Sequence, residues 1–262
     1  MKSLHFRILV IGAILSLGCT TKVSEWVLLN AEPNQYTLVY FHNSPLSDAE
    51  IRQNSTISKS ISSANIGFRN IQKQDISRPY YALFYGSRFF KGYNDSGDLK
   101  GLTVSPLREK IAAEIIAGKL CVILYLTTGD KAKDEQGLRI IHNSLRGSPF
   151  RDVITVVELC RSNTEESHFV SLLLNVEYDL NTIHEPMLFG IFGRFKALEP
   201  LVGKGISEEN IKLMADFLTA DCSCLIKDNL PGTDILFTNK WDNPAPALVN
   251  RILDENPSLQ HL

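Results

Sequence analysis

Short apolar runs of strand length alternate along the chain with longer segments whose apolar residues recur at helical spacing. Runs of about four to eight β-branched, aromatic or apolar residues bounded by turn residues predict strands. We predict single strands over residues 36–42, 65–71, 78–86, 88–93, 119–128 and 152–159, and a strand pair over residues 185–198. The run KLCVILYLTT, residues 119–128, is almost wholly apolar, which is typical of a strand buried on both faces.

Helices are predicted where capping residues border apolar periodicity. In SPLREKIAAEIIAGK, Ser105 can cap the helix, Pro106 suits its first position and Gly118 suits its end. The predicted helices are residues 48–61, 105–119, 134–145, 164–178 and 207–220.

The predicted helices 105–119 and 207–220 each lie at the end of a sequence unit, and the two units are similar. GLTVSPLREKIAAEIIAGK and GKGISEENIKLMADFLTAD share the placement of a glycine, a β-branched residue, a capping serine and apolar positions, so Ser105 and Ser207 are equivalent. Such internal repetition predicts two copies of one supersecondary unit.

The order strand, helix, strand, helix, proline-led strand pair and helix resembles the thioredoxin-like fold, most completely over residues 119–224. The first half departs from it, because only QKQDIS separates its second strand from Pro79. The resemblance implies an α/β protein with two tandem thioredoxin-like domains of order β-α-β-(α)-β-β-α. It also implies that Pro79 and Pro186, which match by order, are cis, although both prolines can equally mark the start of a strand.

The predicted organisation has five parts. They are a signal peptide (1–18), a lipidated N-terminus and tether (19–35), a first domain (36–118), a second domain (119–224) and a C-terminal extension (225–262). In the tether, residues 26–29 could form a first strand or an apolar patch against the domain. The APALVNRILDEN segment of the extension fits an amphipathic helix that packs on the second domain, or else binds a partner.

Composition is that of a folded protein, because 44% of the 262 residues are hydrophobic and 21% are charged. No block of like charge occurs, and the formal net charge is -2. Without a basic stripe there is no electrostatic footprint for nucleic acid, so we expect no nucleic-acid partner.

The N-terminus has the pattern of an export signal. Lys2 and Arg7 precede ILVIGAILSLG, an uncharged run that is too short for the ~20 residues of a spanning helix. The following LSLGC resembles the bacterial lipobox, which implies that Cys19 is lipidated and becomes the mature N-terminus. Ser16 stands where that motif prefers leucine, and Ser16 and Gly18 would also suit ordinary secretory cleavage. Membrane lipid is therefore the first expected partner, through acyl chains on Cys19.

The resemblance also makes a statement about catalysis. Thioredoxin-like oxidoreductases carry CxxC where the first strand meets the first helix, because the helix N-terminus stabilises a thiolate. The corresponding positions here read HNSP (42–45) and TTGD (127–130), without cysteine. The redox activity of the family is therefore not carried over, and we predict no catalytic residue at either place.

The ADCSCL stretch places Cys222 and Cys224 after the last predicted helix, at the end where the helix dipole disfavours a thiolate. The fold order brings this pair near Cys121 and far from Cys160. Three interpretations stay open: a disulfide of Cys222 or Cys224 with Cys121 or with each other, buried thiols, or a redox or metal-handling pair.

No other chemistry is indicated strongly. The sequence contains no HExxH or GxSxG, and no histidine lies at zinc-site spacing from the cysteines, so we predict no metal site and no cofactor. We therefore hypothesise a lipid-anchored, catalytically silent thioredoxin-like protein of the bacterial envelope that binds another envelope component. A thiol-redox or metal-handling protein that uses Cys222 and Cys224 is the alternative, and an enzyme with a site of scattered residues is a third hypothesis.

Overall fold

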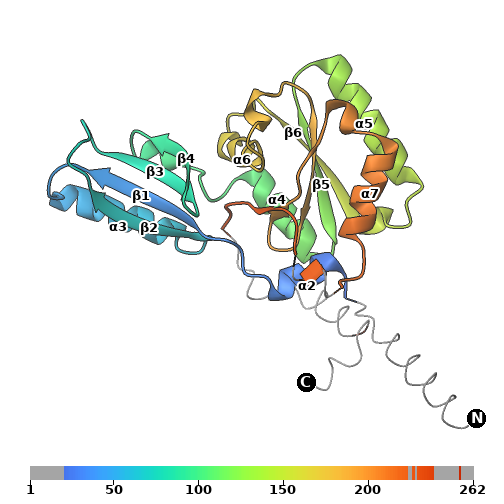
Figure 1. Cartoon of the computed structure of the whole chain (residues 1–262), viewed down its shortest axis with the longest axis horizontal. Coiled ribbons are helices and arrows are strands. Elements are labelled where there is room, and N and C mark those ends of the chain that lie inside the picture. Colours follow the sequence, from blue (N-terminus) through green and yellow to red (C-terminus); the bar gives the residue numbers. More distant parts are fainter. Residues whose placement is uncertain (1–20, 224–225, 228, 239–253, 255–262) are drawn as a thin grey trace, which may run out of the picture.

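Two separate β-sheets, each with its own helices, organise the chain in a computed structural model (Figure 1). The structure describes residues 21–223, 226–227, 229–238 and 254. The predicted signal peptide, Cys19, Cys224 and nearly all of the predicted C-terminal helix lie outside these residues.

The first sheet has the strand order β2-β1-β3-β4. Its strands are β1 (Tyr36–His42), β2 (Ile66–Gln72), β3 (Tyr80–Tyr85) and β4 (Arg88–Tyr93). Helix α3 (Asp48–Ile61) connects β1 to β2. These two strands are parallel, because the helix carries the chain back to the end of the sheet at which β1 began. The other neighbouring pairs are antiparallel.

The two faces of the first sheet are covered differently. On one face α3 packs, and Tyr40 and Tyr81 donate hydrogen bonds from their hydroxyl groups to Glu50 and Asn54 of that helix, at 2.8 and 2.9 Å. No helix connects β2 to β3, which are joined by residues 73–79 alone.

Aromatic side chains cover the second face instead. Phe41 lies 5.2 Å from Tyr80 and 6.4 Å from Phe84, and Phe84 lies 5.8 Å from Phe89, between ring centroids. This layer leaves Ala82 of the central strand β3 only 1% exposed. Because the β2–β3 connection contains no helix, aromatic side chains cover this face of the first sheet.

The second sheet has the order β10-β8-β7-β5-β6, and β9 also pairs with β7. The strands are β5 (Cys121–Thr127), β6 (Ile154–Cys160), β7 (Met187–Phe192), β8 (Lys196–Ala197), β9 (Leu201–Val202) and β10 (Thr233–Asp234). β5 is parallel to β6 and antiparallel to β7. β10 belongs to the predicted extension, so part of that segment is an edge strand of this sheet.

Helices lie on both faces of the second sheet (Figure 1). They are α5 (Lys131–Arg146), α6 (Ser167–Leu173), α7 (Glu208–Leu218) and α4 (Pro106–Ile116), with short 3-10 helices at η1 (Gly97–Leu99), η2 (Arg151–Val153), η3 (Leu180–Thr182) and η4 (Gly203–Gly205). Alternate residues of β5 enter two different cores, Val122 and Leu124 with α6 and α4, and Ile123 with α5 and α7. This explains the continuous apolar run, because a strand buried on both faces needs apolar side chains at every position.

Helix α4 has a different place from the one we predicted. The repeat assigned it to the end of the first domain, yet its main strand contact is β5 of the second sheet. Thr155 of β6 also donates a hydrogen bond to Glu114 of α4, at 2.9 Å. The sequence similarity between α4 and α7 therefore does not indicate equivalent places in two domains. Both helices cover the second sheet, on opposite faces.

For residues 26–29 of the predicted tether, the structure supports the apolar patch against the domain and contradicts the strand. Residues Val23–Asn30 form helix α2, and its Val23 and Val27 are 0% and 1% exposed. Ser24 donates a hydrogen bond to the Leu218 carbonyl at 2.9 Å, which ties α2 to the end of α7. Apolar positions four residues apart favour a helix that buries one side.

The remaining topology agrees with the predicted fold class, a mixed α/β chain with two tandem thioredoxin-like units of which the second is more complete. The predicted cis prolines are wrong, because the described residues contain no cis peptide bond and Pro79 and Pro186 are trans. The trans form is the default for prolines by about 0.5–1 kcal/mol, and tertiary contacts must select the cis form.

Candidate functional site

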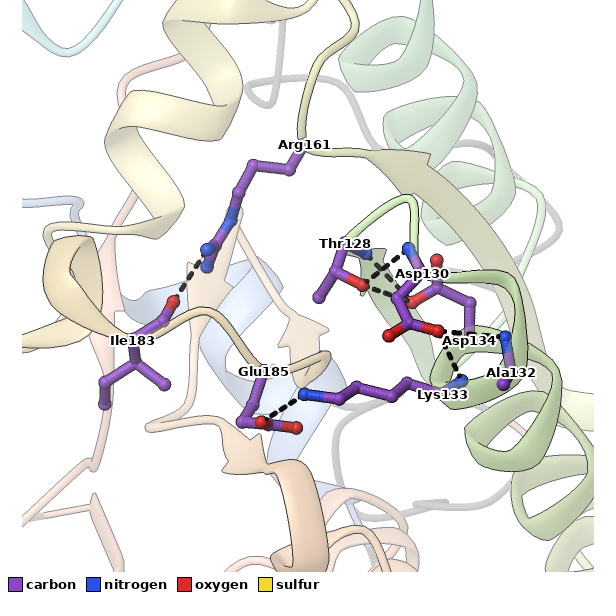
Figure 2. A network of polar contacts seen from close by, with 8 residues as sticks. All are labelled: Thr128, Asp130, Ala132, Lys133, Asp134, Arg161, Ile183 and Glu185. Carbon is purple, nitrogen blue, oxygen red and sulfur yellow. Dashed lines mark hydrogen bonds and ion pairs between the residues drawn. The ribbon is translucent and has the colours of Figure 1, made fainter.

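The carboxyl ends of β5 and β6 meet the start of β7 at one edge of the second sheet. Thr127 of β5 pairs with Cys160 of β6, and Met187 opens β7 opposite Leu126. This edge is the position at which a thioredoxin-like enzyme would carry its reactive cysteines, and Figure 2 shows the polar side chains that occupy it here. Loops at one edge of a rigid sheet are common positions for binding residues.

Asp134 closes the turn between β5 and α5. Its carboxylate accepts hydrogen bonds from the main-chain amides of Thr128 and Gly129, at 2.9 and 2.8 Å, and from the Thr128 hydroxyl at 3.0 Å. The side chain reaches back from the first turn of the helix, so it holds the junction in one conformation.

A second acid caps the same helix. The Asp130 carboxylate accepts hydrogen bonds from the amides of Ala132 and Lys133, at 3.0 and 3.2 Å. These amides are the donors that a helix N-terminus would otherwise offer to a thiolate or an anionic ligand. At this junction the chain satisfies them with its own carboxylates, in agreement with the absence of cysteine from residues 127–130.

Two basic side chains connect the neighbouring loops. The Lys133 ammonium lies 2.5 Å from the Glu185 carboxylate, just before Pro186. The Arg161 guanidinium donates a hydrogen bond to the Ile183 carbonyl at 2.6 Å, as drawn in Figure 2. The Lys133 and Glu185 side chains are 44% and 45% exposed, so their ion pair adds little to stability and can exchange with a ligand's charge.

A cavity of about 820 Å³ opens beside this ion pair. Its walls come from α5, the start of β7, β9, η4 and the first turn of α7, and they comprise Lys133, Gln136, Gly137, Ile140, Glu185, Pro186, Val202, Gly203, Lys204, Ile206, Ser207 and Glu208. We call this cavity the groove. Apolar side chains from three elements line it together with two lysines and two glutamates, a mixture that suits a ligand with apolar and charged groups.

Cys160 is the residue that sequence reasoning missed. It is an exposed free thiol at the end of β6, and its sulfur lies 3.1 Å from the Ser162 hydroxyl. Hydrogen bonding by Ser162 holds the pKa of this thiol below its ordinary value. The sequence already indicated this position. Parallel strands end at the same end of a sheet, and Cys160 is the last residue of β6, the neighbour of β5, whose following residues 127–130 contain no cysteine.

Cys121 and Cys222 lie at the opposite end of the sheet. Cys121 and Cys222 share one apolar core, as expected from the fold order, and Cys222 is 2% exposed. Cys121 is a free buried thiol, and burial raises its pKa to about 12. A disulfide from Cys121 is thus not formed in this structure, and the pairing of Cys222 with Cys224 stays a prediction because Cys224 lies outside the described residues.

The described part of the chain holds neither a metal-binding cluster nor a membrane-spanning helix. No group of three or more histidine, cysteine, aspartate or glutamate side chains there has the arrangement of a metal site. Within the same residues, no helix combines the length and the apolar character needed to cross a membrane.

Comparisons with known proteins add a fold-level likeness. No family profile matches the chain, and no curated protein matches its sequence. Among solved structures, the chain is similar to one described as the first two thioredoxin domains of Naumovozyma dairenensis Eps1p, with 15% identity, 79% of this chain and 98% of that chain covered, and a TM-score of 0.28.

A second similar structure is described as ERdj5 form I, with 12% identity, 63% of this chain and 24% of that chain covered, and a TM-score of 0.23. Superpositions with TM-scores this low carry no argument about this chain. The thioredoxin-like character of the chain rests on its strand order, its parallel β1–β2 and β5–β6 pairs and its helix placement.

Proposed function

We propose that the protein is an exported, lipid-anchored binding protein of the bacterial envelope that uses its second thioredoxin-like domain without the chemistry of a thiol pair. The groove beside Lys133 and Glu185 is the binding site. Its occupant is a segment of another envelope protein that has an apolar side chain flanked by charge.

The β5–α5 junction is the observation that carries this proposal. A thioredoxin-like enzyme needs a thiolate at the first turn of this helix, stabilised by unsatisfied amides and the helix dipole. Here Asp130 and Asp134 accept hydrogen bonds from four amides of the junction and first turn. A thiolate placed there would meet two negative charges and amides that are already occupied.

The groove supports binding through both shape and charge. Ile140, Val202 and Ile206 provide apolar walls on three different elements, so a side chain inserted between them loses its contact with water. Lys204 makes no ion pair with any described residue, and Lys133 pairs only with the half-exposed Glu185. A ligand with an apolar side chain in the groove can therefore place a neighbouring acidic group near Lys133 and Lys204.

Anchoring rests on the sequence alone. Residues 1–18 have the pattern of an export signal, and Cys19 follows the small residues of a lipobox-like motif. Stable attachment to a bilayer takes more than one acyl chain, which bacterial lipidation of an N-terminal cysteine would provide.

The binding site is tested by photocrosslinking in intact cells. A photoreactive amino acid replaces Gln136 in the groove, and a matched chain carries it at His142, on the same helix outside the groove. We expect one discrete adduct from position 136, which weakens when Lys133→Glu and Lys204→Glu are added, and none from position 142. Equal adducts from both positions, or none from either, would contradict the proposal.

Catalytic silence is tested separately by reduction of a disulfide substrate. The purified chain should show no more disulfide reduction than a Cys160→Ser chain in the presence of dithiothreitol. Turnover at the rate of a thioredoxin, lost on substitution of any cysteine, would show an enzyme instead.

A thiol function is the second candidate, and Cys160 is the thiol whose position and pKa support it best. The predicted pair includes Cys222, which is buried at the carboxyl end of α7. Cys160 is exposed, has a lowered pKa and lies at the edge where the groove opens. Alkylation by iodoacetamide distinguishes the two, because a thiol function at Cys160 predicts faster modification there than at Cys222 or Cys224.

A further inference from the structure

We propose that the second domain contacts the lipid bilayer with the end at which α2 lies. The groove, at the other end of the domain, then points away from the membrane. We call the first of these ends the α2 end. The inference rests on the proposed function, because it requires acyl chains on Cys19. It adds a contact surface and an orientation that the anchor alone does not specify.

The chain is fixed to the second domain from Thr21 onward. The Thr21 carbonyl accepts a hydrogen bond from the Cys222 amide at 2.8 Å, and the Val23 amide donates to the Ala220 carbonyl at 2.9 Å. Between them, the Lys22 ammonium lies 2.6 Å from the Asp221 carboxylate. Thr21 is 6% exposed, so a buried residue of the domain stands two positions after Cys19.

Two residues form a very short connection. An extended chain covers at most about 3.3–3.6 Å per residue, so the Thr21 backbone must lie within roughly 7 Å of the Cys19 backbone. A diacylglyceryl group holds the cysteine at the membrane interface, and therefore the surface around Thr21 and Asp221 lies there as well.

The connection cannot lengthen easily, because α2 is held on two sides. Val23 and Val27 pack in the core with α7, and the Arg194 guanidinium donates a hydrogen bond to the Leu28 carbonyl at 2.8 Å. A β-carbon at Gly193 would come within 2.3 Å of Val27, which shows how closely the end of β7 approaches the helix. Release of α2 would expose this apolar surface to water.

The outward side of α2 has the chemistry of a membrane interface. Lys22, Trp26 and Asn30 follow one another at four-residue spacing. Asn30 is exposed, and Lys22 and Trp26 are half-buried, Trp26 because it also packs against the core of the second domain. The Lys227 ammonium lies 5.6 Å from the centre of the Trp26 ring. Tryptophan and lysine are favoured at the headgroup level, where an amphipathic ring and a long cationic side chain each meet both water and lipid.

Further basic residues belong to the same end. Arg146 closes α5, Arg151 opens η2 and Lys119 precedes β5, at the edge where β5 and β6 begin. Acids lie at the same end as well: Glu25 in α2, the exposed Glu32 after it, Asp152 beside Arg151 at 3.5 Å, and Asp221. Charge at this end is therefore mixed, and the proposed orientation rests on the short connection to Cys19 and on the side chains of α2.

The groove lies at the far end of the same strands. β5 has seven residues between the two ends, which at about 3.3 Å per residue separate them by more than ~20 Å. Figure 1 shows α2 across the base of the sheet, below the ends of β5 and α7. A partner segment in the groove would therefore approach from the side opposite the bilayer.

Tryptophan quenching by brominated lipid tests this orientation in the full-length chain. The protein is reconstituted into phosphatidylethanolamine and phosphatidylglycerol vesicles with bromine near the headgroups. One chain carries Trp241→Phe, so that Trp26 is the only tryptophan. The matched chain carries Trp26→Phe, Trp241→Phe and Lys131→Trp, which moves the probe to the exposed first turn of α5 beside the groove.

We expect several-fold quenching of Trp26 and almost none of the probe at position 131. If Trp26→Phe weakens the fold, Lys131→Trp with Trp241→Phe alone gives the same comparison, since the added emission should resist quenching. Equal quenching of both probes, or stronger quenching at position 131, would overturn the proposed orientation while the anchor stands. An intact mass without acyl chains on Cys19 would overturn the anchor itself and the orientation with it.

Discussion

The Arg108 guanidinium donates a hydrogen bond to the main-chain carbonyl of Leu236, 2.9 Å away and 128 residues later in the chain. It also donates to the carbonyls of Leu102, at 2.8 Å, and Gly101, and to the Ser105 hydroxyl at 3.0 Å. The side chain is 0% exposed, and burial lowers its pKa to about 10. One cation therefore joins the linker between the sheets, helix α4 and the segment after β10.

Replacement of Arg108 should destabilise the whole molecule. Arg108→Met leaves three carbonyls without their donor, of which those of Leu102 and Leu236 are bonded in buried surroundings. We expect a loss of roughly 3–5 kcal/mol in the free energy of unfolding, in the range of broken buried polar networks. Urea unfolding followed by circular dichroism measures it. The control Arg139→Met, on the exposed side of α5, should cost less than about 0.5 kcal/mol. Equal costs for the two variants would refute this role.

The buried ion pair between Lys196 and Asp234 should behave as a unit. The two side chains are 9% and 4% exposed and lie 2.9 Å apart, and the Asp234 carboxylate also accepts a hydrogen bond from the Asn34 amide at 3.1 Å. Asp234→Asn leaves the lysine charge buried and should cost about 3–5 kcal/mol. Adding Lys196→Met should restore part of the stability in urea unfolding. Additive losses in the double variant would argue against coupling.

His168 should make stability depend on pH below neutrality. Burial lowers its pKa below the ordinary value of about 6.5, and Lys91 and Arg108 act in the same direction. Above pH ~6.5 the imidazole is neutral in both states, so it contributes no pH dependence there. Below it the unfolded chain binds the proton first, so the free energy of unfolding falls with falling pH.

His168→Gln should flatten this part of the stability profile, measured by urea unfolding at several pH values. His184→Gln, at an exposed position, is the control and should leave the slope unchanged. An unchanged slope in His168→Gln would mean that other groups cause the dependence.

Asp134 should hold the β5–α5 junction closed. Asp134→Ala removes three hydrogen bonds and a negative charge from the first turn of α5, so we expect a loss of about 2 kcal/mol and faster hydrogen exchange at the Thr128 and Gly129 amides. Glu135→Ala removes only exposed ion pairs at 3.8 and 3.9 Å and is the control. Unchanged exchange at both amides in Asp134→Ala would show that the turn holds without it.

The periodicity of the sequence already predicted most of the second sheet and the helix of the first. Helix Asp48–Ile61 has the predicted bounds, and its cap is the local pattern of Ser47 and Glu50, whose side chains bond to each other's main-chain amides. The absence of cysteine from residues 127–130 was likewise visible without coordinates. These features depend on neighbouring residues, and local sequence therefore determines them.

Only the tertiary structure decided where the elements pack. Helix α4 lies on the second sheet because it packs on β5 and because its own Arg108 bonds to the Leu236 carbonyl after β10. Residues 23–30 are a helix and not a tether because a surface made by α7 and β7, almost two hundred residues away, buries Val23 and Val27. The pairing of β6 with β5 likewise put Cys160 opposite Thr127, at the β5–α5 junction. Such outcomes depend on the free energy of burying surfaces that are distant in sequence, which no local pattern contains.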